Sequence, residues 1–260
     1  MLTPIRLDYG PDPSQFAELT LPPDDTPPRG IVMVVHGGFW RQDYGLELGR
    51  PLAADLAADG FAVLNVEYRR VGGGGGWPDT FTDVATALDL LAGPAAEAAC
   101  GRPLLDRVVA VGHSAGGHLA TWLAARPGLP PAAPGAGARV RLIGVVSQAG
   151  VLDLVDAAER GVGAGAVDDL LGGPPAAVPD RYALASPTAR VPLGVPVVCV
   201  HGTSDDRVPL RQSERFVAAA RAAGDPAELV VLPEVDHFAV IDPAAQAWRT
   251  CRDAAIRLLA

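Results

Sequence analysis

The chain has 260 residues, nearly half of them hydrophobic, which is enough for one domain with a substantial core. Its formal charge of −9 argues against a nucleic-acid or membrane-surface partner, because both are bound through basic surfaces. The sequence contains no lysine, so Schiff-base chemistry and a phosphate-loop lysine are excluded. No apolar run approaches the roughly 18 residues of a membrane span, and no signal-peptide pattern opens the chain, so we expect a cytoplasmic monomer or homodimer.

Short apolar runs alternate with helical patterns along the chain. The expected strands cover residues 31–35, 61–66, 108–111, 139–147, 195–200 and 228–232. The expected helices cover residues 46–59, 79–91, 114–125, 211–223 and 243–259. This alternation predicts an α/β fold with a mostly parallel sheet covered by helices on both faces.

Three regions interrupt the alternation. Residues 71–76 contain five consecutive glycines, and residues 126–138 are rich in proline, glycine and alanine, so both are expected to be loops. Residues 149–190 carry short helical patterns between glycines. We therefore expect a single domain, residues 1–260, with a small cap within residues 149–190.

The cysteines do not indicate a metal site or a disulfide framework. Cys100, Cys199 and Cys251 are odd in number and widely spaced, without the spacing of metal ligands. We expect reduced and mostly buried thiols, and we expect no metal or cofactor.

The strongest motif lies between an expected strand and an expected helix. Residues 108–119 read VVAVGHSAGGHL, which contains Gly-x-Ser-x-Gly in the context that the motif requires. Gly112 and Gly116 permit a sharp turn that exposes the Ser114 hydroxyl, and the helix start offers N–H groups to a developing negative charge. These features predict that Ser114 is a nucleophile, the alternative being a purely structural turn.

A serine nucleophile needs a base and an orienting carboxylate. His36, His113 and His118 lie too close to the sheet-to-helix turns to be the base, and His201 directly ends a strand. His237 lies in the loop between the last strand and the last helix, from which an imidazole can reach the serine. The sequence therefore predicts His237 as the base.

The orienting carboxylate has three candidates. Asp205 and Asp206 both lie in the turn that follows the strand expected at residues 195–200, and chemistry alone does not separate them. Asp153 follows the preceding strand and is a weaker candidate.

Motifs along most of the chain resemble those of a known superfamily. They are YGPDP (9–13), HGGFW (36–40), EYRR (67–70), WP (77–78), GHSAGGHL (112–119), SP (186–187), HGTSDDRVP (201–209) and DHF (236–238). The chain resembles α/β-hydrolases of the esterase and lipase superfamily, most of all the kynurenine formamidase (arylformamidase) branch, which is related to the hormone-sensitive-lipase group. The order serine, aspartate, histidine is also that of the superfamily.

The resemblance implies roles for several residues. The acid would be Asp205, which stands three residues before the Val-Pro pair, and the oxyanion hole would be formed by the N–H groups of Gly38, Phe39 and Ala115. His36 would fix the turn rather than take part in catalysis. Phe39 stands where the lipase group has a third glycine, which implies a narrow pocket for a small acyl or formyl group.

Aromatic residues near the expected site could form a wall for the substrate. Trp40, Trp77 and Phe238 are the candidates, with plain packing as the alternative. The expected function is hydrolysis of a small-acyl ester or an aryl formamide through an acyl-enzyme and without a cofactor. The alternatives are a peptidase of the prolyl-oligopeptidase type, against which the HGGFW segment weighs, and an inactive binding protein on the same fold.

Overall fold

The computed structural model describes residues 3–23, 27–93, 96 and 102–260. Cys100, one of the three predicted thiols, lies outside these residues. Cys199 and Cys251 are buried and form no disulfide, as predicted. Burial raises the pKa of each of these two thiols to about 12, so both stay protonated.

Within the described residues, eight strands form one sheet in the order β1-β2-β4-β3-β5-β6-β7-β8. Strand β2 runs antiparallel to both of its neighbours, β1 and β4, and β3 to β8 are parallel. The strands are β1 (Ile5–Asp8), β2 (Phe16–Thr20), β3 (Ile31–Val35), β4 (Ala62–Val66), β5 (Val108–His113), β6 (Gly144–Gln148), β7 (Val197–Gly202) and β8 (Ala227–Leu232). The carboxyl ends of six strands therefore lie along one edge of the sheet.

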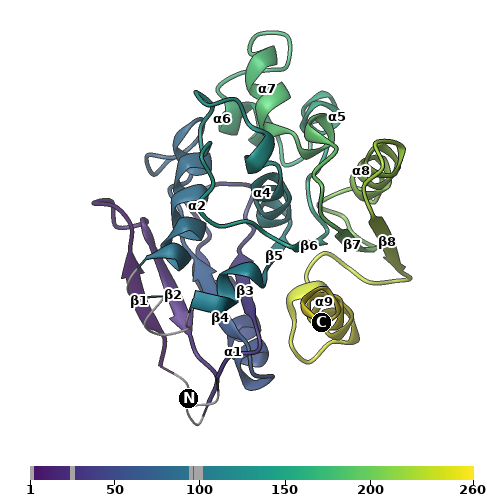
Figure 1. Ribbon diagram of the computed structural model, residues 1–260. Coiled ribbons are helices and arrows are strands. Elements are labelled where there is room, and N and C mark those ends of the chain that lie inside the picture. The colour runs from purple at the N-terminus through teal and green to yellow at the C-terminus, as the bar shows by residue number, and fades with distance from the viewer. Residues whose placement is uncertain (1–2, 24–26, 94–95, 97–101) are drawn as a thin grey trace.

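Helices connect the strands and cover both faces of the sheet (Figure 1). The α-helices are α1 (Arg50–Ala58), α2 (Asp79–Asp89), α4 (Ala115–Ala124), α5 (Leu154–Glu159), α6 (Ala166–Leu171), α7 (Pro179–Ala185), α8 (Arg211–Ala222) and α9 (Gln246–Leu259). Short 3-10 helices cover Leu46–Leu48, Leu90–Ala92, Arg102–Asp106, Arg126–Gly128, Pro187–Arg190 and Ala239–Ile241.

The sheet separates two hydrophobic cores. One face packs against α2, α4 and α8 through residues such as Phe81, Leu119 and Phe216. The other face packs against α1 and α9 through residues such as Leu56 and Trp248. Strands β3 to β7 are buried at every residue, as expected for parallel strands covered on both sides.

The structure corrects two of the predicted elements. The helix predicted at 46–59 starts at Arg50, where Pro51 suits the first turn, and residues 46–48 form a 3-10 turn. The strand predicted at 139–147 begins only at Gly144, because the N–H groups of Arg139 and Val140 donate to the Asp89 carboxylate instead of a neighbouring strand.

Strands β1 and β2 were not predicted from the sequence. Both are short, and β1 is mostly exposed, so neither carries the continuous apolar run that marks the central strands. Antiparallel pairing with β4 attaches this ribbon to the side of the sheet. Among the described residues, every helix is too short or too polar to cross a membrane.

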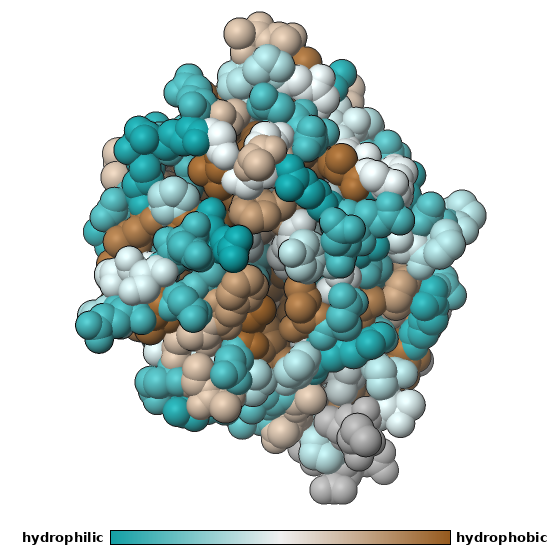
Figure 2. Space-filling view, turned by 180° about the vertical axis from the view of Figure 1, so that it is seen from behind, coloured by the Kyte–Doolittle hydropathy of each residue, from teal (hydrophilic) through white to brown (hydrophobic). Residues whose placement is uncertain are grey.

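Helices α5, α6 and α7 lie together beyond one end of the sheet (Figure 1). This segment contacts the loops that follow β3 and β4. Arg41 Nη2 donates to Ala164 O at 3.1 Å, and the Trp77 N–H donates to Leu170 O at 2.7 Å. Figure 2 shows the opposite side of the molecule, where hydrophobic residues gather in a hollow near the centre, surrounded by hydrophilic ones.

Candidate active site

Ser114 occupies a strained turn between β5 and α4. Its backbone has φ 55° and ψ −117°, a conformation that non-glycine residues rarely adopt. The turn leaves no room for side chains at the flanking glycines, since a Cβ on Gly112 would lie 2.1 Å from Gly116 O. A Cβ on Gly116 would lie 2.0 Å from Val35 O. The glycines of the motif are therefore required by the close approach of α4 to β3 and β5.

His237 and Asp205 form a close pair across two loops. Asp205 follows β7, and His237 follows β8. Nδ1 of His237 lies 2.6 Å from Oδ2 of Asp205, and because an ionised carboxylate only accepts, the imidazole donates. The other ring nitrogen, Nε2, is then left to accept a proton.

The Asp205 carboxylate is held in its ionised form. Its side chain is 1% exposed, and Oδ1 accepts the N–H groups of Arg207 and Val208 at 2.9 and 2.8 Å. Burial raises the pKa of Asp205, but hydrogen bonding to His201, His237 and the Val208 N–H outweighs it and holds that pKa well below its ordinary value. The buried carboxylate is therefore a permanent charge beside His237.

The other two acid candidates have different surroundings. The Asp206 side chain is 74% exposed and pairs with Arg207 at 3.3 Å. Asp153 caps α5 by accepting the Asp156 N–H and pairs with Arg215 at 2.7 Å. Neither contacts His237 in the described part of the chain.

Ser114 and His237 line one cavity of about 150 Å³. Five of the lining residues have polar side chains, and the rest of the wall is apolar. Among the described residues no hydrogen bond joins the Ser114 hydroxyl to His237. The lining consists of Gly38, Phe39, Tyr44, Leu48, His113, Ser114, Arg207, His237, Phe238 and Ile241.

The segment after β3 lies directly against Ser114. A Cβ on Gly37 would lie 3.1 Å from Ser114 Cβ, and the next two residues have positive φ, 113° at Gly38 and 51° at Phe39. Arg41 N–H donates to Gly38 O at 3.0 Å, which fixes the peptide unit that carries the Phe39 N–H. Within the residues that the structure describes, the N–H groups of Gly38 and Phe39 have no hydrogen-bond partner. Ala115 opens α4, whose first N–H groups have no partner within the helix.

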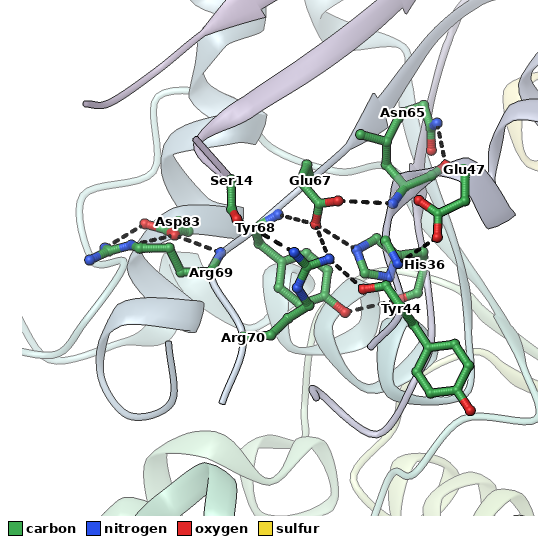
Figure 3. Close-up of polar contacts among 12 residues, drawn as sticks. Ser14, His36, Tyr44, Glu47, Asn65, Glu67, Tyr68, Arg69, Arg70 and Asp83 are labelled. Carbon is green, nitrogen blue, oxygen red and sulfur yellow. Dashed lines mark hydrogen bonds and ion pairs between the residues drawn. The ribbon is translucent and has the colours of Figure 1, made fainter. Parts of the chain in front are cut away.

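The His36 ring makes its hydrogen bonds with Gly37 and Glu67 rather than with Ser114 (Figure 3). Its Nδ1 lies 2.8 Å from Gly37 O, and its Nε2 lies 3.0 Å from Glu67 Oε1. The ring also stacks on Tyr68 at 4.4 Å, and the Tyr68 hydroxyl donates to His36 O. These contacts give His36 the turn-fixing position that the resemblance implied.

Two further histidines are neutral and buried. His113 Nε2 donates to the backbone oxygen of His237 at 2.8 Å, and burial lowers the His113 pKa to about 3. Its ring lies 4.5 Å from that of His237, so it supports the loop that carries the predicted base. His118 Nε2 donates to Ala185 O, and burial lowers the His118 pKa to about 4. The fifth histidine, His201, contacts Val208 O.

The three aromatic residues predicted to contact substrate differ from one another in burial and in whether they line the cavity. Trp40 is 1% exposed and donates from Nε1 to His118 Nδ1, so it is a core residue away from the cavity. Trp77 packs edge-on against Phe81 and does not line the cavity either. Phe238 is 55% exposed and does line it. Of these three residues, Phe238 lines the cavity, and the other two do not.

Five lining residues were not anticipated from the sequence: His113, which directly precedes Ser114, and Tyr44, Leu48, Arg207 and Ile241. Tyr44 and Leu48 follow the HGGFW segment, Arg207 follows the Asp-Asp pair, and Ile241 follows DHF. Their proximity to those motifs was the available signal, but no periodicity shows which loop residues turn inward. Arg207 brings a positive charge to the rim of the cavity.

The sheet, the strained serine turn and the loops at the carboxyl ends of the strands define an α/β-hydrolase fold. Solved structures agree with this class along nearly the whole chain. A truncated carbohydrate esterase from gut microbiota has a TM-score of 0.81 at 22% identity, covering 98% of this chain and 95% of that one. The propionate-bound esterase Est2 of Thermogutta terrifontis has a TM-score of 0.77 at 24% identity, covering 98% and 93%. These likenesses confirm the predicted fold class.

The family follows from the sequence comparison. The BD-FAE family model matches residues 17–219, and the chain belongs to the BD-FAE family. Two curated relatives come from Mycobacterium tuberculosis. Esterase LipC is 28% identical over 92% of this chain, and the probable carboxylic ester hydrolase LipM is 29% identical over 85%. The chain spans 60% and 52% of the lengths of these two relatives.

Proposed function

We propose that the protein is a carboxylic ester hydrolase that uses Ser114 as nucleophile, His237 as base and Asp205 as the orienting acid. The observation that carries the proposal is the joint placement of Ser114 and His237 in one cavity, with His237 bound to a buried carboxylate. The two curated relatives, named as an esterase and a probable carboxylic ester hydrolase, support the same reaction class.

The mechanism follows from the groups present. His237 Nε2 takes the proton of the Ser114 hydroxyl as the oxygen attacks the ester carbonyl, and Asp205 stabilises the imidazolium that forms. The N–H groups of Gly38, Phe39 and Ala115 receive the negative oxygen of the tetrahedral intermediate. Protonated His237 then gives its proton to the leaving alcohol, and a water molecule releases the acid by the same steps.

The cavity favours a small acyl group. Its volume of about 150 Å³ is limited on one side by the Phe39 ring, which rests on Gly163: a Cβ added there would lie 2.4 Å from Phe39 Cδ1. The segment 149–190 would therefore serve as a cap that holds Phe39 in place. The same restriction supports a second candidate, hydrolysis of an aryl formamide, because a formyl group is smaller than an acetyl group.

The decisive experiment compares kcat/KM for p-nitrophenyl acetate, p-nitrophenyl butyrate and N-formylkynurenine, with Ser114→Ala as the blank. We expect hydrolysis of the acetate ester that disappears in Ser114→Ala. A rate that survives this substitution would overturn the proposal. Greater efficiency on N-formylkynurenine than on both esters would select the formamidase candidate.

A fluorophosphonate probe tests the nucleophile without a substrate. We expect covalent labelling of the wild type at Ser114. A folded protein that remains unlabelled would favour the inactive binding protein, and cleavage of peptide p-nitroanilides in preference to esters would favour the peptidase.

A further inference from the structure

We propose that Glu67, which does not line the cavity, is the positioning residue for residues 36–39, here called the oxyanion segment. This inference rests on the proposed function. Glu67 follows β4, and its side chain is 7% exposed. Oε1 accepts from His36 Nε2 at 3.0 Å, from the Tyr68 N–H at 2.9 Å and from Arg70 Nη1 at 2.7 Å. Oε2 accepts the Leu46 N–H at 3.0 Å. Figure 3 shows the carboxylate at the centre of these donors.

The contact with His36 reaches the oxyanion segment through one peptide plane. The imidazole lies between the Glu67 carboxylate and Gly37 O, which is 2.8 Å from Nδ1. The ring therefore bridges the buried carboxylate and the backbone carbonyl. The Gly37 carbonyl and the Gly38 N–H belong to the same planar peptide unit, so the direction of one fixes the direction of the other. Glu67 thereby orients the Gly38 N–H.

The remaining contacts hold the opposite wall of the cavity. Oε2 of Glu67 binds the Leu46 N–H, and Arg70, which pairs with Glu67, donates from Nη1 to the backbone oxygen of Tyr44. Tyr44 and Leu48 both line the cavity. One buried carboxylate therefore ties the segment at 36–39 to the wall at 44–48.

The charge state of Glu67 agrees with this role. Burial raises the Glu67 pKa, but hydrogen bonding to His36 and the charge of Arg70 outweigh it and hold that pKa below its ordinary value. Glutamine at this position keeps the volume but replaces one carboxylate oxygen by an NH2 donor, so it cannot accept from all four of the donors that surround Glu67. We expect the contact that holds the His36 ring to weaken.

Asp83 in α2 offers a matched control. Its side chain is 1% exposed and accepts from Arg69 Nη2 at 2.7 Å, from the Arg69 N–H at 3.0 Å and from Gln15 Nε2 at 2.8 Å. It is a buried, paired carboxylate that appears in the same close-up as Glu67 (Figure 3), and among the described residues no hydrogen bond or ion pair joins it to residues 36–39 or 44–48. Asp83→Asn thus removes a comparable charge without affecting the oxyanion segment.

The test measures kcat, KM and thermal stability for Glu67→Gln and Asp83→Asn with p-nitrophenyl acetate. Removing one oxyanion donor costs about 100- to 1,000-fold in kcat, so misorienting one predicts a loss of about 10- to 100-fold in Glu67→Gln. We expect KM to change less than about threefold, because the lost contact acts mainly in the transition state. Asp83→Asn should lose stability with kcat within about twofold of the wild type. Equal kcat losses in both variants at equal loss of stability would overturn the proposal.

Hydrogen–deuterium exchange of residues 36–48 gives a readout that needs no activity. We expect faster exchange of this segment in Glu67→Gln and unchanged exchange in Asp83→Asn; unchanged exchange in both would overturn the proposal. Glu67→Asp, which keeps the charge on a shorter side chain, replaces Glu67→Gln if the latter does not fold. A wild type without esterase activity would refute the proposed function, while the exchange result still decides the role of Glu67.

Discussion

The imidazole of His237 donates from Nδ1 to Oδ2 of Asp205 over 2.6 Å, and the accepting carboxylate is almost completely buried. Asparagine at position 205 has an amide NH2 that donates and an oxygen that accepts, whereas the aspartate carboxylate only accepts. The His237 imidazole is then no longer held in one orientation and one tautomer. We expect Asp205→Asn to lower kcat by about 10³- to 10⁴-fold on p-nitrophenyl acetate, as the loss of the triad acid does in serine proteases. Steady-state kinetics measures this directly.

Asp206→Asn is the control for that experiment. Asp206 is the next residue in the chain, but its side chain is exposed and pairs with Arg207. We expect its kcat to stay within about threefold of the wild type, since exposed ion pairs contribute little. A larger loss from Asp206→Asn than from Asp205→Asn would show that the acid was assigned to the wrong residue.

The backbone of Ser114 stores strain that glycine would relieve. With φ 55° and ψ −117°, serine and alanine are both disfavoured, whereas glycine adopts positive φ freely. We expect Ser114→Gly to be more stable than Ser114→Ala by about 1 kcal/mol in urea unfolding, although both lack the proposed nucleophile. Ala120→Gly, in the middle of α4, should instead lose about 1 kcal/mol or more. Equal stability of the two Ser114 variants would contradict the strain.

The Phe39 ring limits the acyl side of the cavity. Phe39→Ala removes the ring that lies between the cavity and Gly163. Each additional methylene of the substrate that fits into a hydrophobic pocket contributes about 1–3 kcal/mol to transition-state binding. We expect the ratio of kcat/KM for p-nitrophenyl butyrate over acetate to rise about tenfold. Phe238→Ala, which changes the exposed rim, should affect both esters to a similar extent. An unchanged ratio in Phe39→Ala would mean that another residue sets the acyl size.

Sequence patterns predicted the central sheet because its strands are buried on both faces. The run that became β3 is uniformly apolar, and those of β4 and β5 are largely so; the glycines around Ser114 mark a turn that accepts no side chain. Patterns failed where tertiary contacts decide the outcome. The Asp89 carboxylate accepts the Arg139 N–H, so the strand does not begin at Arg139, and no local sequence pattern indicates that contact.

In the candidate site, too, some residues could be predicted from the sequence and others depend on tertiary packing. Ser114 and His237 could be proposed because their chemistry and order are restrictive, whereas only the resemblance separated Asp205 from Asp206. The structure brings all three to one edge of the sheet. The side chains around them could not be proposed reliably, because loop direction depends on packing. Trp40 illustrates this: it directly follows Phe39 in the chain, yet it turns inward to His118 while Phe39 lines the cavity.

His118 should make the stability of the protein depend on pH. Burial lowers its pKa to about 4, whereas in the unfolded chain the value returns to about 6.5. Between these values the unfolded state binds one proton more, so the free energy of unfolding falls as the pH falls from about 6.5 to about 4, by up to about 1.4 kcal/mol per pH unit for this residue.

His118→Gln isolates that contribution, because glutamine does not titrate and can still accept from Trp40 and donate to Ala185 O. Carboxylates with lowered pKa, such as Asp205, also lose their stabilising effect in acid, but only below their ordinary value of about 4. The window above pH of about 4.5 therefore reports mainly on histidines. We expect urea unfolding at several pH values in this window to give a smaller slope for His118→Gln than for the wild type. An unchanged slope would mean that His118 is already protonated in the folded protein, and Trp40 Nε1 would then lack its acceptor.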